Sequence, residues 1–369
     1  MYNWQFEKWA EFIYNEEIIN DNSLKLSELT GEIFGIFKTF SSVKQQNEII
    51  DIMISEAIKT SAIEGEMLSR EDVRSSFLKK LGLTTNIKNI KDKRAENIAL
   101  LILQVRNNFR EKLTEKQIKQ WHGMLFSNSK YINAGVYRTA EEPMQIVSGI
   151  MGKEKVHFEA PPSTRIPQEM KNFVKWYNGF KTQGNIRKII VKTAITHIYF
   201  ESIHPFEDGN GRIGRVLIEK CLSESFGRQI IMSISQTIEK NRNRYYDELK
   251  RAQSTLEIDG WLQYFSQLLI DAQQNALEIL DFSIKKTHFF DKYRSTFNTR
   301  QTKAINKMLD AGKDGFEGGM TAKKYVSITK TTKATATRDL QELVENNILQ
   351  QNLAGRSTNY ILNMEHFYS

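Results

Sequence analysis

The stretch that determines the fold is His204-Pro-Phe-Glu-Asp-Gly-Asn-Gly-Arg-Ile-Gly-Arg215. Residues 193–203 before it and 216–222 after it carry apolar side chains at helical spacing, which predicts two helices joined by this loop. Gly209 and Gly211 permit backbone conformations that other residues avoid, so they mark a tight turn. The sequence therefore predicts a helix-loop-helix that gathers a base, carboxylates and arginines at one helix N-terminus.

These residue types suit a phosphate-binding site. The unpaired N–H groups at a helix N-terminus favour a bound anion. Arg212 and Arg215 lie three residues apart on the first helical turn, and two guanidiniums beside these amides favour a polyphosphate. Asp208 suits Mg²⁺, and His204 is the natural acceptor of a proton from an attacking hydroxyl. The alternative is a purely structural turn, which needs neither the histidine nor the two arginines.

The twelve residues also match every fixed position of the Fic family motif, H-x-F-x-[D/E]-G-N-G-R-x-x-R, and the chain resembles that family. The resemblance implies a mainly α, Fic-type helical bundle that transfers AMP from ATP to a Ser, Thr or Tyr hydroxyl of a target protein. His204 is then the base and Asp208 the Mg²⁺ ligand. The residues assigned to the phosphates of ATP are Gly209, Asn210, Gly211, Arg212 and Arg215. The second glycine favours AMP transfer over the kinase-like branch, which usually has lysine there.

A second stretch, Thr60-Ser-Ala-Ile-Glu64-Gly65, ends a helix predicted over residues 45–61. Taken alone, a Glu-Gly pair indicates only a glycine that ends a helix. Beside the loop, it resembles the Fic inhibitory motif [S/T]-x-x-x-E-[G/N]. The resemblance implies that Glu64 pairs with Arg215 and fills the position of the γ-phosphate, which makes the chain a class II, self-inhibited member.

Three further segments resemble parts of the family. Residues 144–147 and 155–158, around glycines, predict a β-hairpin, which resembles the flap that aligns a target segment by strand pairing. Gly135-Val-Tyr-Arg138 is similar to the family's G-x-[YF]-R run. Tyr246 and Gln253 match the positions that contact the base or ribose, although a charged amphipathic helix with core tyrosines explains that segment equally well.

The chain divides into three predicted parts. Residues 1–44 form a helical N-terminal extension of two helices joined near residue 20, and residues 45–284 form the Fic domain with its inhibitory helix. Residues 285–369 predict three helices and a β-hairpin with Arg356 at its tip, and this order resembles a winged helix. The segment 291–369 has 12 Lys or Arg against 8 Asp or Glu, a surplus of four. DNA binding, protein docking and a homodimer stay open.

The amino-acid composition limits the class of protein to which the chain can belong. The 369 residues are 40% hydrophobic and 26% charged, a balance typical of globular domains. The sequence contains no apolar run of the roughly 18 residues that a membrane span requires, so no membrane contact is expected. A lone cysteine, Cys221, excludes an internal disulfide and favours a cytoplasmic location. The net charge of +8 permits an acidic partner or nucleic acid without requiring either.

Two alternatives to AMP transfer stay open. The first is removal of AMP, alone or in a bifunctional enzyme, with Glu64 positioning a water molecule. The second is a winged-helix regulator that binds DNA and uses the Fic domain only to sense nucleotide. The intact His204 argues against the second alternative, because a sensor needs no base.

Overall fold

The computed structural model describes residues 1–83, 90–148, 155–313, 315–353 and 358–363. The chain divides into two compact units, Met1–Ala276 and Leu277–Ser369. This boundary falls inside α11 (Asp259–Tyr293), whereas the sequence places the division at residue 285. Each unit has its own buried core, so the two are described separately.

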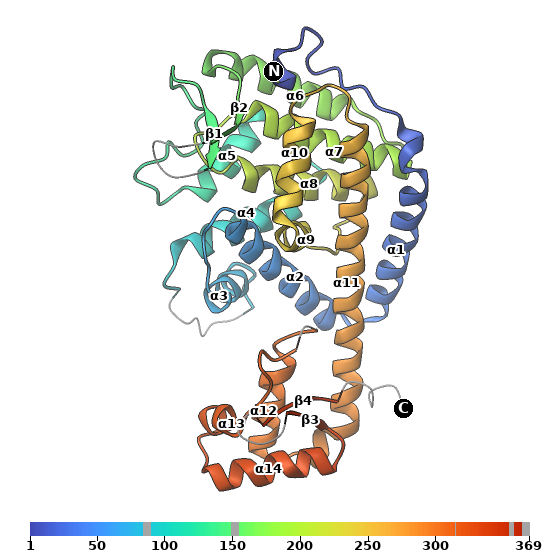
Figure 1. The fold of residues 1–369 in the computed structure, drawn as a ribbon, viewed down its shortest axis with the longest axis vertical. Coiled ribbons are helices and arrows are strands. Elements are labelled where there is room, and N and C mark those ends of the chain that lie inside the picture. The colour runs from blue at the N-terminus through green and yellow to red at the C-terminus, as the bar shows by residue number, and fades with distance from the viewer. Residues whose placement is uncertain (84–89, 149–154, 314, 354–357, 364–369) are drawn as a thin grey trace. The chain divides into compact units, whose positions relative to one another are not determined.

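The first unit is mainly helical (Figure 1). Its helices are α1 Asn20–Thr39, α2 Ser42–Ile63, α3 Arg70–Lys80, α4 Lys93–Asn107, α5 Glu115–Leu125, α6 Ile166–Gly179, α7 Ile186–Ile203, α8 Asn210–Phe226, α9 Ile234–Lys240, α10 Arg242–Ala252 and the first part of α11. Helices α7 and α8 pack side by side at its centre, and every residue of α7 from Ile189 to Ile203 is buried. This central place explains why α7 is buried on all sides rather than along one stripe.

The N-terminal segment corrects one prediction. Two helices were expected before residue 40, but residues 3–19 contain only two short 3₁₀ turns, η1 Asn3–Gln5 and η2 Glu16–Ile19. The aromatic residues there are fixed by distant partners: the Trp4 indole donates to the Glu159 carbonyl oxygen (2.6 Å), and the Trp9 indole to Glu169 Oε2 (2.9 Å). Long-range contacts of this kind override the local helical spacing.

The predicted β-hairpin is confirmed. Strands β1 (Gln145–Ser148) and β2 (Lys155–Glu159) pair antiparallel, with Ile146 opposite Phe158. Phe158 is buried and packs edge-on against Tyr2 with 5.1 Å between ring centroids, which ties the hairpin to the N-terminal segment. The connecting residues 149–154 lie outside the described residues.

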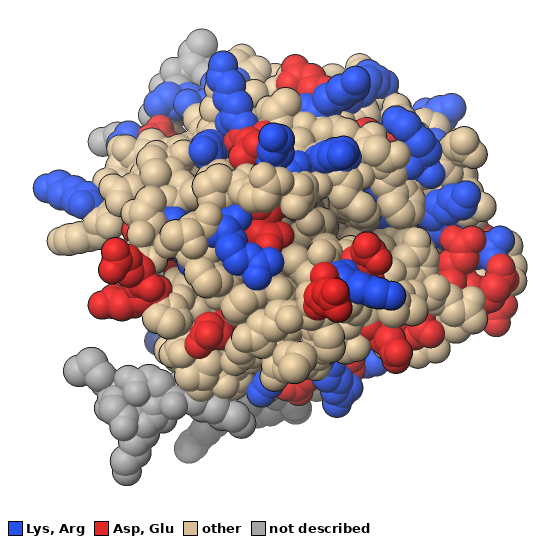
Figure 2. Space-filling view, turned by 90° about the horizontal axis from the view of Figure 1, so that it is seen from above, with Lys and Arg blue, Asp and Glu red and all other residues tan. Residues whose placement is uncertain are grey.

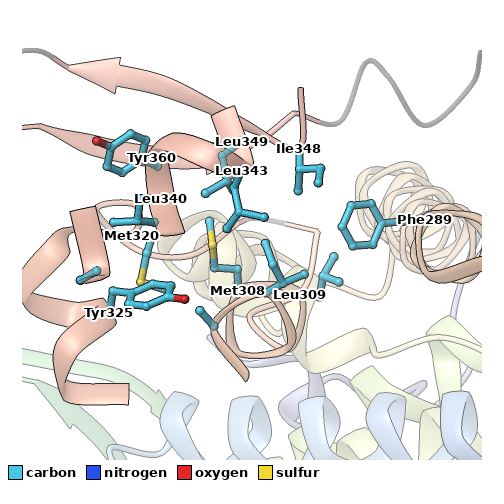
Figure 3. Packing of buried hydrophobic residues seen from close by; sticks show 13 residues of the cluster. Phe289, Met308, Leu309, Met320, Tyr325, Leu340, Leu343, Ile348, Leu349 and Tyr360 are labelled. Carbon is cyan, nitrogen blue, oxygen red and sulfur yellow. The ribbon is translucent and has the colours of Figure 1, made fainter. Parts of the chain in front are cut away.

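The second unit contains the end of α11, the short turn η4 (Arg294–Thr296), three helices and a hairpin. The helices and strands are α12 Thr299–Leu309, α13 Ala322–Thr329, α14 Lys333–Glu345, β3 Leu349–Leu353 and β4 Asn359–Leu362. Met320 pairs with Tyr360 through two backbone hydrogen bonds and so extends the hairpin by one antiparallel bridge. Figure 3 shows the apolar core that these elements enclose. The elements lie where the sequence predicts them, while the winged-helix assignment stays a prediction and Arg356 is outside the described residues.

No helix among the described residues is long and apolar enough to cross a membrane. On the face shown in Figure 2, Lys and Arg lie among Asp and Glu instead of gathering in one continuous patch.

Candidate active site

The site lies in the connection between α7 and α8, residues 204–209. His204 ends α7 in a left-handed conformation (φ 48°), and its N–H donates to the Phe200 carbonyl oxygen (3.0 Å). Gly209 begins α8 with φ 79°, and a Cβ there would lie only 2.6 Å from the Phe126 ring. Both the backbone angle and this close approach require glycine.

Side-chain contacts hold the loop in shape. Phe206 is fully buried and stacks on His122, with 4.0 Å between the ring centroids. The Asn210 side chain accepts from the Phe206 N–H (3.0 Å) and donates to the Phe206 carbonyl oxygen (2.8 Å). The Asn210 side chain therefore holds the loop in shape through both its oxygen and its nitrogen.

Arg138 fixes the beginning of the loop. Its guanidinium donates to the carbonyl oxygens of His204 (2.8 Å) and Pro161 (2.5 Å), and its N–H donates to Pro205 (2.9 Å). Arg138 is 4% exposed, and a cation at the C-terminus of α7 also opposes the negative end of the helix dipole. The residue belongs to the Gly135–Arg138 run that the sequence singled out.

His204 has the surroundings of a neutral base. Burial, followed by the positive charge of Arg138, lowers the pKa of His204 to about 4. The imidazole is therefore uncharged at neutral pH and able to accept a proton. Its Nδ1 is buried without a hydrogen-bond partner, 3.9 Å from Glu201 Oε2.

Arg215 is paired as the inhibitory motif predicts. Its side chain is 1% exposed and donates to Glu64 Oε1 (2.7 Å), Thr60 Oγ1 (2.7 Å) and the Thr60 carbonyl oxygen (3.0 Å). Burial raises the pKa of Glu64, but the charge and hydrogen bond of Arg215 outweigh it, and the pKa stays below its ordinary value. Glu64 is thus a carboxylate, which competes for the guanidinium that a phosphate would bind.

The same carboxylate also covers the N-terminus of α8. A Cβ placed on Gly211 would collide with Glu64 Oε1, so the carboxylate lies against the backbone of the first turn. The unpaired N–H groups of this turn are the predicted anion site. In this arrangement Glu64 pairs with Arg215 and also covers the N–H groups that are predicted to bind a phosphate.

Glu66 is a site residue that the sequence reasoning missed. Its Oε2 lies 2.9 Å from Arg212 Nη1, so each motif arginine pairs with a carboxylate from the segment that ends α2. Gly65 between the two glutamates adopts φ 80°, which turns the chain so that both reach α8. The alternation Glu64-Gly65-Glu66 opposite two arginines is the signal that could have revealed it.

Buried contacts on α2 hold these carboxylates in place. Glu56 is 5% exposed and accepts from Ser233 Oγ (2.8 Å), from the Ser235 N–H (3.0 Å) and from the Ser235 hydroxyl, next to the N-terminus of α9. A carboxylate at a helix N-terminus is favoured by the helix dipole. The end of α2 is therefore positioned by its packing as well as by the arginines it pairs with.

Asp208 fits a magnesium ligand. Its side chain is 52% exposed, and Oδ1 accepts from the Gly209 N–H (2.5 Å) while lying 3.5 Å from Arg212 Nη2. Among the described residues, Asp208 belongs to no cluster of three or more His, Cys, Asp or Glu that could hold a metal alone. This donor set fits Mg²⁺, which is often held by one or two carboxylates together with substrate phosphates and water.

The two residues predicted to contact the base or ribose of the nucleotide differ in exposure. Tyr246 on α10 is 38% exposed, and burial followed by the charge of Glu64 raises its pKa. Gln253 at the end of α10 is 3% exposed and donates to the Glu201 carbonyl oxygen (3.2 Å). Tyr246 is open to a ligand, whereas the side chain of Gln253 is already engaged inside the protein.

Comparisons with known proteins agree with this geometry. The Fic/DOC family profile matches residues 112–222, and a domain of unknown function (DUF4172) matches residues 2–83. A probable protein adenylyltransferase of Aquifex aeolicus is 33% identical over 96 residues, 26% of this chain and 27% of that protein. The protein adenylyltransferase Fic of Aedes aegypti is 27% identical over 110 residues, 30% of this chain and 20% of that protein. The chain thus spans about a quarter of the length of these relatives.

Solved structures show the same fold. A Fic family protein from Desulfovibrio desulfuricans aligns with a TM-score of 0.52 at 18% identity, covering 92% of this chain and 95% of that one. A Fic domain containing signaling protein from Bacteroides thetaiotaomicron gives 0.53 at 20% identity, covering 69% and 97%. These likenesses show the fold alone, and the Fic/DOC family profile identifies residues 112–222 within it as a Fic/DOC domain.

Proposed function

We propose that the protein is an adenylyltransferase that moves AMP from ATP to a hydroxyl of a target protein and that Glu64 inhibits it. The observation that carries this proposal is the convergence of a neutral His204, the N-terminus of α8 and two arginines on one loop. These groups supply a base and positive charge where an ATP phosphate chain would lie. The names of the relatives point to the same reaction.

The reaction uses His204 as the base. The target hydroxyl oxygen attacks the α-phosphorus as His204 takes its proton, an O–P bond forms, the bond to the bridging β-phosphate oxygen breaks, and pyrophosphate leaves. Arg212 and Arg215 stabilise the charge that grows on pyrophosphate. Mg²⁺, when bound by Asp208 and the phosphates, neutralises part of the same charge.

The hairpin β1–β2 is the proposed docking element for the target segment. It is two-stranded, and Val147 and Val156 are exposed at 47% and 40%. Extended peptides bind such edges by backbone hydrogen bonds, which places a target hydroxyl by register rather than by its surrounding sequence. This proposal fits Ser, Thr and Tyr alike.

A second role, DNA binding, is proposed for the unit Leu277–Ser369. Helix α14 begins at the Thr332 cap, and Lys333 and Arg338 are exposed on its first turns. A helix of this kind can place threonine and arginine side chains in a major groove. A steep loss of affinity for duplex DNA with salt, reduced by Arg338→Ala, would support this role.

The main proposal is tested by the position of the label in ATP. The Glu64→Gly variant, incubated with Mg²⁺ and a lysate, should add label above that of the lysate alone from ATP carrying ³²P at the α-phosphate and not at the γ-phosphate. Glu64→Gly/His204→Ala should add no label from either. Transfer from the γ-phosphate would indicate phosphorylation, and loss of AMP from a labelled protein without transfer would favour the reverse reaction.

A further inference from the structure

Glu201 is a buried carboxyl group that the proposed mechanism does not use. It lies in the last turn of α7, three residues before His204, and is 4% exposed. Its Oε2 lies 3.9 Å from His204 Nδ1. Among the described residues, neither His204 Nδ1 nor the other carboxyl oxygen, Oε1, has a hydrogen-bond partner. Buried polar atoms without partners are costly, so this carboxyl group beside the imidazole calls for a functional reason.

The carboxyl group lies between two buried histidines. A Cβ on Gly214 would collide with Glu201 Oε1 and would lie 3.2 Å from His197 Nδ1, so α8 leaves room for the group by having no side chain there. His197 pairs through Nε2 with the Tyr245 hydroxyl (2.7 Å), and among the described residues its buried Nδ1 has no hydrogen-bond partner. Burial raises the pKa of Glu201 to about 8. The positive charge of Arg215 opposes this rise, and the negative charge of Glu64 adds to it.

We propose that Glu201 is the positioning residue of the base: its carboxyl oxygen accepts the Nδ1–H of His204 and leaves Nε2 free to take the hydroxyl proton. The inference rests on the function proposed above. A small rotation of the Glu201 side chain closes the gap to a hydrogen bond, because among the described residues Oε1 has no hydrogen-bond partner that would hold the carboxyl group in place. The contact fixes the tautomer and the orientation of the imidazole, and no proton passes to Glu201.

Gly214 is explained by the same contact. An alanine at Gly214 would displace the Glu201 carboxyl group. Gly214→Ala should therefore act on His204 through Glu201. In the absence of Glu201 the alanine should have little further effect, so the two substitutions should be non-additive.

Kinetics give the first test, in the Glu64→Gly background with AMP incorporation as the readout. Glu201→Ala should lower kcat about 10- to 100-fold and leave KM for ATP unchanged, because the variant loses the group that orients the base and loses no contact with the phosphates. Glu201→Gln, which keeps an acceptor oxygen, should lose less. Ser202→Ala, equally buried on the same helix, is the matched control and should leave kcat unchanged. An unchanged kcat in Glu201→Ala would overturn the proposal.

Imidazole ¹⁵N spectra give the second test and do not depend on activity. In histidine-labelled protein, with the His204 signals identified by their loss in His204→Ala, the wild type should show the tautomer protonated at Nδ1. Glu201→Ala should shift the population toward protonation at Nε2. An unchanged pattern would overturn the proposal even if no AMP transfer is found. A shifted pattern without AMP transfer would instead uphold the contact and refute the proposed reaction.

Discussion

The two ends of the stretch from His204 to Arg215 differ in how their polar side chains are paired. At the arginine end, Arg215 makes three hydrogen bonds and Arg212 faces Glu66, so the positive charges are matched by carboxylates of this chain. At the histidine end, His204 Nδ1 and Glu201 Oε1 are buried and have no hydrogen-bond partner among the described residues. The charged groups of the arginine end are therefore paired within the chain, whereas the histidine end holds buried polar atoms without partners.

On the proposed function, this difference predicts which half of the site is regulated. The ion pairs with Glu64 and Glu66 would then keep both arginines from binding a phosphate and would leave the base in place. Arg138 and Asn210 hold the loop backbone independently of α2. Substitution of the glutamates should therefore free the arginines while the loop keeps its conformation, so substitutions at the two ends should have different effects.

The largest effect is expected at the histidine end. In the Glu64→Gly background, His204→Ala should lower the rate of AMP transfer by about 10²- to 10⁴-fold, the usual contribution of a general base. The unpaired arginine end should still bind ATP, so calorimetry should give a similar Kd for both proteins. AMP transfer that persists at the parent rate would refute the role of His204.

Breaking the loop anchor should cost both stability and activity. Arg138→Met removes hydrogen bonds to buried carbonyl oxygens and should lower the free energy of unfolding by about 2–4 kcal/mol. The control is Arg110→Met, which loses one exposed bond to Gly227 and should change it by less than about 0.5 kcal/mol. Urea denaturation measures both, and equal changes would mean that Arg138 does not anchor the loop.

A smaller effect is expected from Glu66. Its side chain is 24% exposed, and partly exposed ion pairs contribute about 0.2–1 kcal/mol, so Glu66→Gln should raise AMP transfer by at most about fivefold. The rise should persist in the Glu64→Gly background, since the two glutamates contact different arginines. Initial rates of labelling decide this, and a rise larger than that of Glu64→Gly would reverse the ranking of the two contacts.

The sequence was most informative where the site is contiguous. Twelve consecutive residues define the loop. Thr60 and Glu64 lie close together at the end of one helix, at a spacing that suits contact with a single arginine. A short local pattern is therefore enough to predict both parts of the site. The helix positions of the second unit follow from apolar periodicity in the same way. In each case the residues that act together are close in the chain.

The sequence was least informative where partners are distant. The helix expected before residue 20 is absent, because Trp4 and Trp9 bond to residues more than 150 positions away. Gln253 is engaged by the Glu201 backbone, a contact that depends on how α10 packs on α7. Neither packing arrangement is visible in a single sequence.

The central claim is that Glu64 holds the arginine end closed, and one comparison of rates tests it most directly. Initial rates of AMP transfer at saturating ATP and Mg²⁺ should be about 10- to 100-fold higher for Glu64→Gly than for the wild type. A charged hydrogen bond of this kind contributes about 1.5–3 kcal/mol. Glu64→Gln, which keeps the size and loses the charge, should fall between. Equal rates for the wild type and Glu64→Gly would contradict the account.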